Sequence, residues 1–167
     1  LPVIGLNTAV LSISSQNFGA KNYNRIRELY LKALKFGCSF MIIAGFVIYF
    51  NASSLIGLFT NDSNTIYYGS IYLKIAALIG PIYPTFFITT ALFQSVKKPI
   101  YSLYLGILRL TALPFICLWF VINIKNGSYE DIFYTLLFTN WFMGICVLIF
   151  IGSYFNRKFN EKMIISK

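Results

Sequence analysis

The sequence predicts an all-α, polytopic bundle of about five membrane-spanning helices. Hydrophobic residues make up 57% of the 167 residues, charged residues only 11%, and the mean hydropathy is +0.70. A soluble domain carries about 25% charged residues, so this chain has too little polar surface to face water on all sides. Its apolar residues form long runs, most of them of the length that a helix needs to cross a ~30 Å hydrocarbon core.

Five apolar segments are separated by short polar connections, and we expect a helix in each. They are residues 1–18, 36–59, 66–96, 100–124 and 132–155. Spanning strands would be ~10 residues long and alternate in polarity, whereas a helix satisfies its own backbone hydrogen bonds in lipid. The first segment opens on Leu1 without the pattern of a signal peptide. We therefore expect a fragment of a longer multi-pass protein, with its bundle over residues 1–155.

The basic residues predict how the bundle is oriented. Of the 14 Lys and Arg residues, two lie on one side of the bundle, Lys74 and Lys125, and Arg109 lies within a span. The other eleven lie on the opposite side: Lys21, Arg25, Arg27, Lys32, Lys35, Lys97, Lys98, Arg157, Lys158, Lys162 and Lys167. The positive-inside rule places that side, with a basic tail over 156–167, in the cytoplasm. We expect a cytoplasmic (inner) membrane protein, and this arrangement argues against a nucleic-acid partner despite the net charge of +9.

The residue types that carry enzyme chemistry are scarce. The sequence has no histidine, and its five acidic residues all fall in connections or near the C-terminus. Cys38, Cys117 and Cys146 lie in apolar runs without the spacing of metal ligands. We therefore expect neither an enzyme nor a metal or cofactor site.

Three connections carry helix-ending and capping signals. Gly19 is expected to end the first helix in the left-handed conformation, and Asn22 or Asn24 to cap the next one. Asp62 or Ser63 can cap the third segment, and Ser128 with Asp131 forms a capping box before the fifth.

Arg109 is the one charged residue deep within an expected span. It lies about ten residues beyond Pro99, so about 15 Å into the membrane at ~1.5 Å per residue. An arginine isolated in lipid is costly, by ~3 to over 10 kcal/mol. Two interpretations follow: Arg109 has a structural or snorkelling role, or it lines a solute path.

The third segment has the most irregular sequence. Pro81 and Pro84 interrupt its hydrogen-bond ladder and predict a kink that could act as a hinge. A semi-polar stripe follows at helical spacing, formed by Tyr83, Phe87, Thr90 and Gln94. Asn7 and Ser14 share a face of the first helix. Such residues either hold helices together in lipid or line a cavity, as the broken helices of transporters do.

The first connection resembles a known signature. Residues 14–28 read S-S-Q-N-F-G-A-K-N-Y-N-R-I-R-E and resemble the Q-N-x-G-A-x-N-x-x-R motif of the multidrug and toxic compound extrusion (MATE) family. Residues 58–62 are similar to that family's L-F-x-x-D outer loop, and residues 72–75 to the Y-L-R-I at the start of its tenth helix.

Two further features agree in order with this resemblance. Residues 92–99 resemble the family's L-Q-G-x-G-x-x-x-P hairpin, with Ser95 and Lys97 replacing the usual glycines. Arg109 falls where members often carry an arginine in the eleventh helix. The resemblance implies the end of helix eight through helix twelve, which is most of the C-terminal lobe of a two-lobe transporter.

The function that the resemblance implies is antiport. Such a transporter exports organic cations and drugs in exchange for H⁺ or Na⁺ by alternating access, with the lipid bilayer and the N-terminal lobe of the same protein as partners. One branch of the family has an acidic residue in helix ten, but residues 66–96 contain no Asp or Glu. A coupling carboxylate would then come from a part of the protein outside this sequence.

Two alternatives remain open at the level of sequence. A lipid-linked saccharide flippase of the same superfamily would favour a more cationic cavity around Arg109. A non-transporting membrane assembly subunit would have small-residue faces and no kinked polar span.

Overall fold

A computed structural model describes residues 2–124 and 127–159, and these residues contain helices and no strand. The all-α prediction is confirmed. In chain order the helices are α1 (Pro2–Gly19), α2 (Tyr23–Gly57), α3 (Ser63–Ile79), η1 (Gly80–Ile82), α4 (Tyr83–Ser95), α5 (Pro99–Ile107), η2 (Leu108–Ala112), α6 (Leu113–Asn123), α7 (Tyr129–Tyr154) and η3 (Phe155–Phe159). The η1 turn is a 3₁₀ helix, whereas η2 and η3 are π helices. Lys125 and the expected tail from residue 160 lie outside the described residues.

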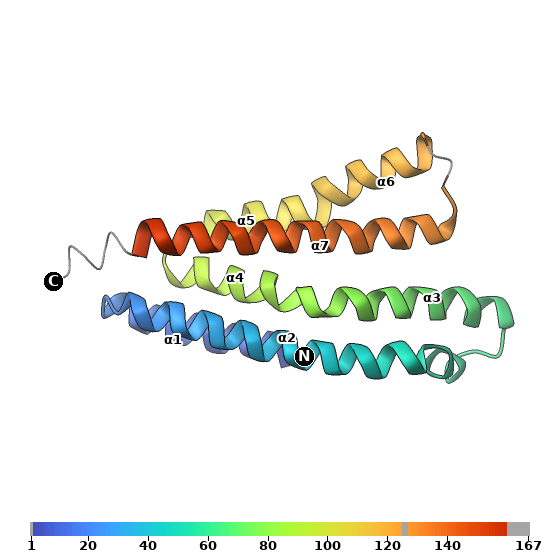
Figure 1. Ribbon diagram of the computed structural model, residues 1–167, viewed down its shortest axis with the longest axis horizontal. Helices are drawn as coiled ribbons and strands as arrows, with labels where there is room; N and C mark the ends of the chain where they lie inside the picture. Colours follow the sequence, from blue (N-terminus) through green and yellow to red (C-terminus); the bar gives the residue numbers. More distant parts are fainter. Residues whose placement is uncertain (1, 125–126, 160–167) are drawn as a thin grey trace.

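The helices form an elongated bundle with one central rod (Figure 1). The consecutive helices α3, η1 and α4 make up this rod, with α1 and α2 along one side and α7 along the other. A second bent rod, made of α5, η2 and α6, packs against α4 and α7. Because α4 contacts α1, α2, α5 and α7, it is the most enclosed part of the bundle.

Four rods within the described residues are long and apolar enough to cross a membrane, judged by length and composition. They are Tyr23–Gly57, Ser63–Ser95, Pro99–Asn123 and Tyr129–Arg157, and they contain most of the last four expected spans. The helix α2 begins at Tyr23, directly after the expected cap position Asn22, and so extends well before the apolar span 36–59. Arg25, Arg27 and Lys32 therefore lie on the first turns of a helix. The remaining helix, α1, has 18 residues and is not among the four.

Two of the predicted caps are present, and the first turn differs from expectation. The Asp62 carboxylate accepts hydrogen bonds from the backbone N–H and the hydroxyl of Thr65 at 2.7 and 2.6 Å, and the hydroxyl contact lowers the pKa of Asp62. Ser128 and Asp131 form the predicted capping box. Asn22 occupies the N-cap of α2 without a side-chain cap bond. The left-handed residue after α1 is Lys21, with φ 57°, and not Gly19.

The predicted kink in the third segment is present as the η1 turn. Pro81 and Pro84 have no N–H to donate, so the carbonyls of Ala77 and Gly80 lose their α-helical partners. The Gly80 carbonyl accepts instead from the N–H of Tyr83, within the 3₁₀ turn. One residue along, the Leu78 carbonyl accepts a hydrogen bond from Trp141 Nε1 of α7 at 3.1 Å.

Glycines on the neighbouring helices allow this bend to be packed tightly. A Cβ atom at Gly45 would lie 2.8 Å from the Ala77 carbonyl oxygen, and one at Gly37 would lie 2.9 Å from the Pro84 Cβ. A Cβ at Gly144 of α7 would overlap the Ile82 side chain. The bend is therefore enclosed by α2 on one side and by α7 on the other.

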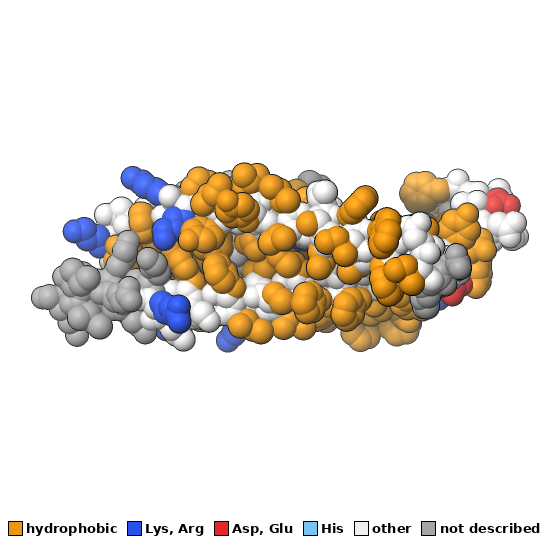
Figure 2. Space-filling view, turned by 90° about the horizontal axis from the view of Figure 1, so that it is seen from above, with side chains coloured by type: hydrophobic (Ala, Val, Ile, Leu, Met, Phe, Trp, Pro, Cys, Tyr) orange, Lys and Arg blue, Asp and Glu red, His pale blue; other side chains and the backbone are white. Residues whose placement is uncertain are grey.

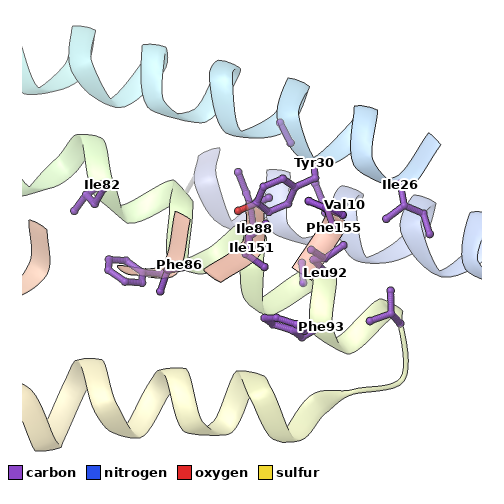
Figure 3. Close-up of a cluster of buried hydrophobic side chains, with 14 of the residues drawn as sticks. Val10, Ile26, Tyr30, Ile82, Phe86, Ile88, Leu92, Phe93, Ile151 and Phe155 are labelled. Carbon is purple, nitrogen blue, oxygen red and sulfur yellow. The ribbon is translucent and has the colours of Figure 1, made fainter. Parts of the chain in front are cut away.

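The core lies where α4 meets α1, α2 and α7 (Figure 3). Val10, Tyr30, Ile88, Leu92 and Ile151 are almost completely buried there. The Tyr30 hydroxyl and the Thr89 hydroxyl of α4 are 2.9 Å apart and share a hydrogen bond. Burial of this apolar surface, together with the satisfied hydroxyl pair, fixes α2 against α4.

The outer surface suits a protein in a bilayer. Hydrophobic side chains cover much of the length of the molecule in Figure 2, and most of the visible Lys and Arg gather at one end. The large exposed side chains include Phe46, Phe50, Leu110, Phe115 and Ile149, each at least 60% exposed. A soluble monomer rarely exposes apolar surface on this scale.

Candidate functional site

Arg109 lies at the centre of a small cluster that joins three elements. Its guanidinium carbon is 4.4 Å from the centre of the Tyr83 ring and 3.8 Å from the centre of the Phe86 ring, both on α4. Its Nε donates a hydrogen bond of 3.4 Å to Oδ1 of Asn140 on α7. Cation–π contacts of this kind contribute about 0.5–2 kcal/mol each. Arg109 is thus half-buried and held against the bundle by neutral partners.

The local backbone turns Arg109 toward this cluster. Arg109 is the second residue of the π turn η2, in which the N–H of Leu113 donates to the carbonyl of Leu108. Pro114 follows immediately and has no N–H, so an unbroken α-helical ladder is impossible at this point. A π turn re-aims side chains and occurs often at functional sites.

Two cavities share the Arg109 side chain in their lining. The α3–α7 cavity, of about 240 Å³, is lined by Tyr72, Ile75, Ala76, Ile79, Tyr83, Arg109, Leu110, Pro114, Phe133, Leu136 and Asn140. The α4–α5 cavity, of about 300 Å³, is lined by Tyr83, Phe86, Phe87, Thr90, Ser102, Leu105, Gly106, Arg109 and Leu110. Tyr83, Arg109 and Leu110 belong to both, so Arg109 borders both volumes.

Four of the residues predicted for a solute path lie together. Tyr83, Phe87, Thr90 and Arg109 all line the α4–α5 cavity. The rings of Tyr83 and Phe87 stack with their centres 6.4 Å apart. The hydroxyl of Ser102 donates a hydrogen bond to the Thr90 carbonyl at 3.1 Å, which joins α5 to α4 at the cavity wall.

The other three predicted residues lie away from both cavities. The side-chain amide of Asn7 donates to the Phe87 carbonyl at 2.9 Å and so holds α1 against α4. The Ser14 hydroxyl is completely buried and has no hydrogen-bond partner among the described residues. Gln94 is exposed one turn beyond Thr90. Asn7 thus matches the interpretation in which polar residues hold helices together.

The hinge candidates border the cluster without lining the α4–α5 cavity. Pro84 is buried against Gly37, and Pro81 is half-buried beside a separate apolar cavity that Gly45 and Trp141 also line. Tyr83 lies between the two prolines in sequence. Any change in the bend would therefore move the ring that contacts Arg109.

The sequence analysis did not identify Asn140, Phe86 and Ser102 as parts of the site. Asn140 is an amide residue within the fifth apolar segment, which is a usable signal, since polar residues within spans are costly and tend to be functional. Phe86 and Ser102 carry no comparable signal. They adjoin the site because of how α5 packs on α4.

The described residues offer no grouping of His, Cys, Asp and Glu that could hold a metal ion. Of the described acidic residues, Glu28 pairs with Lys32 on the first turns of α2 at 2.6 Å, and Asp62 and Asp131 cap helices. None of these three carboxylates lines the two cavities around Arg109.

Comparison with known proteins identifies the family. The MatE family model matches residues 1–120. A protein called "FAD transporter" from Shewanella oneidensis is 29% identical over 150 residues, which cover 86% of this chain and 31% of that protein.

Solved structures of transporters share the fold. A MOP superfamily transporter from Pyrococcus furiosus matches with a TM-score of 0.83 and 18% identity over 89% of this chain and 34% of that one. A multidrug resistance MATE family transporter of the MOP superfamily, in an outward-facing conformation, matches with a TM-score of 0.83 and 18% identity over 97% and 35% of the two chains. A crystal structure of MATE in complex with MaL6 gives a TM-score of 0.85 at 17% identity, over 97% and 36%.

The chain spans about a third of the length of these relatives. Its family match nevertheless covers well over half of the sequence, and the resemblance seen in residues 14–28 lies within the matched region. The chain therefore belongs to the MatE family of membrane transporters.

Proposed function

We propose that this chain is most of the C-terminal lobe of a secondary active transporter, which exports small organic solutes in exchange for H⁺ or Na⁺ by alternating access. The observation that carries the proposal is the pair of cavities around Arg109, beside a helix that two prolines bend. Transporters place their binding sites at broken helices and move one bundle against another. The N-terminal lobe of the same protein would close the site from the opposite side.

The proposed location is the cytoplasmic (inner) membrane, with the C-terminus in the cytoplasm. The clustering of Lys and Arg at one end of the bundle supports this orientation. A coupling carboxylate would come from outside this chain, because the third segment carries no acid. We assign the protein to transport and not to catalysis on the basis of its family.

Two classes of cargo follow from the relatives. The resemblance to the extrusion family implies organic cations and drugs, and the Shewanella oneidensis relative is named for FAD. A lipid-linked saccharide flippase is a second candidate function, favoured by the position of the cationic Arg109 at the border of two cavities. A non-transporting assembly subunit is disfavoured because the chain has the kinked polar span that such a subunit would lack.

The experiment is ion-driven transport by the full-length protein in proteoliposomes. With an imposed H⁺ or Na⁺ gradient, a labelled solute should move against its own gradient, and an ionophore that collapses the ion gradient should stop it. A panel that includes an organic cation, FAD and a lipid-linked saccharide would distinguish the candidates. If the rate of solute movement did not change with either the H⁺ or the Na⁺ gradient, antiport would be contradicted.

A further inference from the structure

The charge of Arg109 is not compensated by any acid that the structure describes. The ion pair among the described residues joins Lys32 to Glu28 at one end of α2. Arg109 has instead two aromatic faces, of Tyr83 and Phe86, and one amide oxygen, of Asn140. These partners orient the guanidinium and stabilise it in part, but they are neutral, so a net positive charge remains at the junction of the two cavities.

We propose that Arg109 forms the anion subsite of the solute path, and that the cargo is a small organic anion with an aromatic ring system. The proposal rests on the transport function proposed above and names the substrate class of the same site. A carboxylate or phosphate group fits the planar guanidinium with two parallel hydrogen bonds. The half-buried position of Arg109 would strengthen that contact relative to one at the fully exposed surface.

The walls of the α4–α5 cavity favour an aromatic body for this anion. Three rings, of Tyr83, Phe86 and Phe87, line that cavity together with Arg109. Aromatic pairs prefer offset-stacked or edge-to-face arrangements, and the stacked Tyr83 and Phe87 rings already present such a wall. Its volume of about 300 Å³ is at the lower end of the range for ligand pockets, about 300–1,000 Å³. One or two fused rings with a single acidic group are therefore the expected size.

The same arrangement disfavours an organic cation at this point. A cation that entered the cavity would lie beside Arg109 with no carboxylate of the described residues between them, and like charges repel. This selectivity is opposite to the organic cations that the family resemblance implies. The charge of the cargo therefore provides a direct test.

The test is equilibrium binding to the purified full-length protein in detergent, with two probes that share one ring system. Naphthyl phosphate carries the anion, and naphthylmethylammonium carries the opposite charge on the same rings. Isothermal titration calorimetry should show that the wild type binds the phosphate more tightly. Arg109→Gln should weaken phosphate binding about tenfold or more, since it removes a charge-assisted contact, without weakening binding of the ammonium probe.

Two further variants control for charge and folding. Arg109→Lys keeps the charge but loses the planar fork, so phosphate binding should fall less than in Arg109→Gln. It also tests the site if Arg109→Gln does not fold. Lys74→Gln removes another half-buried cation, one that contacts the Tyr49 ring and lines neither cavity, and it should change phosphate binding by less than about twofold.

The outcomes separate this inference from the proposed function. Equal phosphate affinity in wild type, Arg109→Gln and Arg109→Lys would overturn the anion subsite, and so would tighter wild-type binding of the ammonium probe. Because binding is measured without an ion gradient, ion-coupled transport can fail while the binding result stands. Conversely, coupled export of a cation without phosphate binding would support the transporter and reject the subsite.

Discussion

At the scale of single residues, two lysines take a backbone conformation that normally favours glycine. Lys21 and Lys97 follow α1 and α4 with φ angles of 57° and 59°. In both turns the N–H of the following residue donates a hydrogen bond to the carbonyl five residues earlier. These bonds run from Asn22 to the Asn17 carbonyl and from Lys98 to the Phe93 carbonyl. That pattern closes a helix in a Schellman motif, where glycine is the usual residue because a Cβ costs energy in this conformation.

We expect Lys97→Gly to stabilise the protein. The left-handed conformation costs a non-glycine residue about 1 kcal/mol, and the larger freedom of glycine in the unfolded state offsets part of the relief. A net gain of a few tenths to about 1 kcal/mol should appear as a higher midpoint of thermal unfolding of the full-length protein. Lys97→Ala is the matched control, because it removes the same charge but keeps the Cβ. An equal gain in both variants would attribute the effect to charge.

Four of the residues that the structure brings together at one cavity are ones for which the sequence carried a costly or periodic signal. Tyr83, Phe87 and Thr90 follow helical spacing, and Arg109 is a charge within an apolar run, so four lining residues of the α4–α5 cavity could be predicted. The contact from Arg109 to Asn140 joins α7 to η2 across 31 residues. It depends on how the helices pack, and no local pattern encodes it.

At the scale of elements, the bend between α3 and α4 is the feature with the clearest mechanical role. Pro81 and Pro84 remove two backbone donors, and the Leu78 carbonyl is held by Trp141 from α7. Replacing both prolines by alanine would restore those donors and favour a straight helix. That change would shift Tyr83 relative to Arg109.

We expect the double variant Pro81→Ala, Pro84→Ala to slow ion-driven export several-fold in proteoliposomes at equal protein abundance. Pro99→Ala is the matched control. Pro99 is the first residue of α5, where a helix needs no N–H donor, so its replacement should leave the rate unchanged. Unchanged rates in the double variant would remove the hinge role, and an equal loss in the control would indicate a general effect of the substitutions.

The bend could be predicted from the sequence, but its packing could not. Two prolines in an apolar helical segment remove backbone N–H donors, so they predict an interruption of the helix from the sequence alone. Room for the bend is made by three glycines of the neighbouring helices, Gly37, Gly45 and Gly144. Which residues face the bend depends on the register between helices, and this register depends on the whole bundle. The helix α2 is also longer than the apolar segment 36–59 that it contains, because it begins next to the expected cap position Asn22. Charge marks where a helix leaves the apolar core, but α2 continues through Arg25 and Arg27.

At the scale of the whole molecule, composition was sufficient to predict the class of fold. In the part of the chain that the structure describes, four apolar rods are long enough to cross a membrane, and hydrophobic side chains cover much of the face shown in Figure 2. One long surface therefore suits lipid, and the cavities around Arg109 suit a path shared with a second lobe. Such global properties average over many residues and do not depend on the detail of any one contact.

The topology follows from the same charges and is open to direct measurement. Asn22, between α1 and α2, and Asn61, between α2 and α3, are exposed and lie at the two ends of α2. Lys and Arg gather at the end of the bundle where α1 turns into α2. The positive-inside rule therefore places Asn22 in the cytoplasm and Asn61 outside.

We expect a membrane-impermeant maleimide to label Asn61→Cys in intact cells and Asn22→Cys only after the cells are opened. Cys38, Cys117 and Cys146 would first be replaced by serine or alanine, so that each variant carries one thiol. Glu28→Cys, one helical turn and a half beyond Asn22, provides a second cytoplasmic position whose labelling should match that of Asn22→Cys. Labelling of Asn22→Cys and Glu28→Cys in intact cells, with Asn61→Cys protected, would reject the proposed orientation. That result would place the basic end of α2 outside the cell.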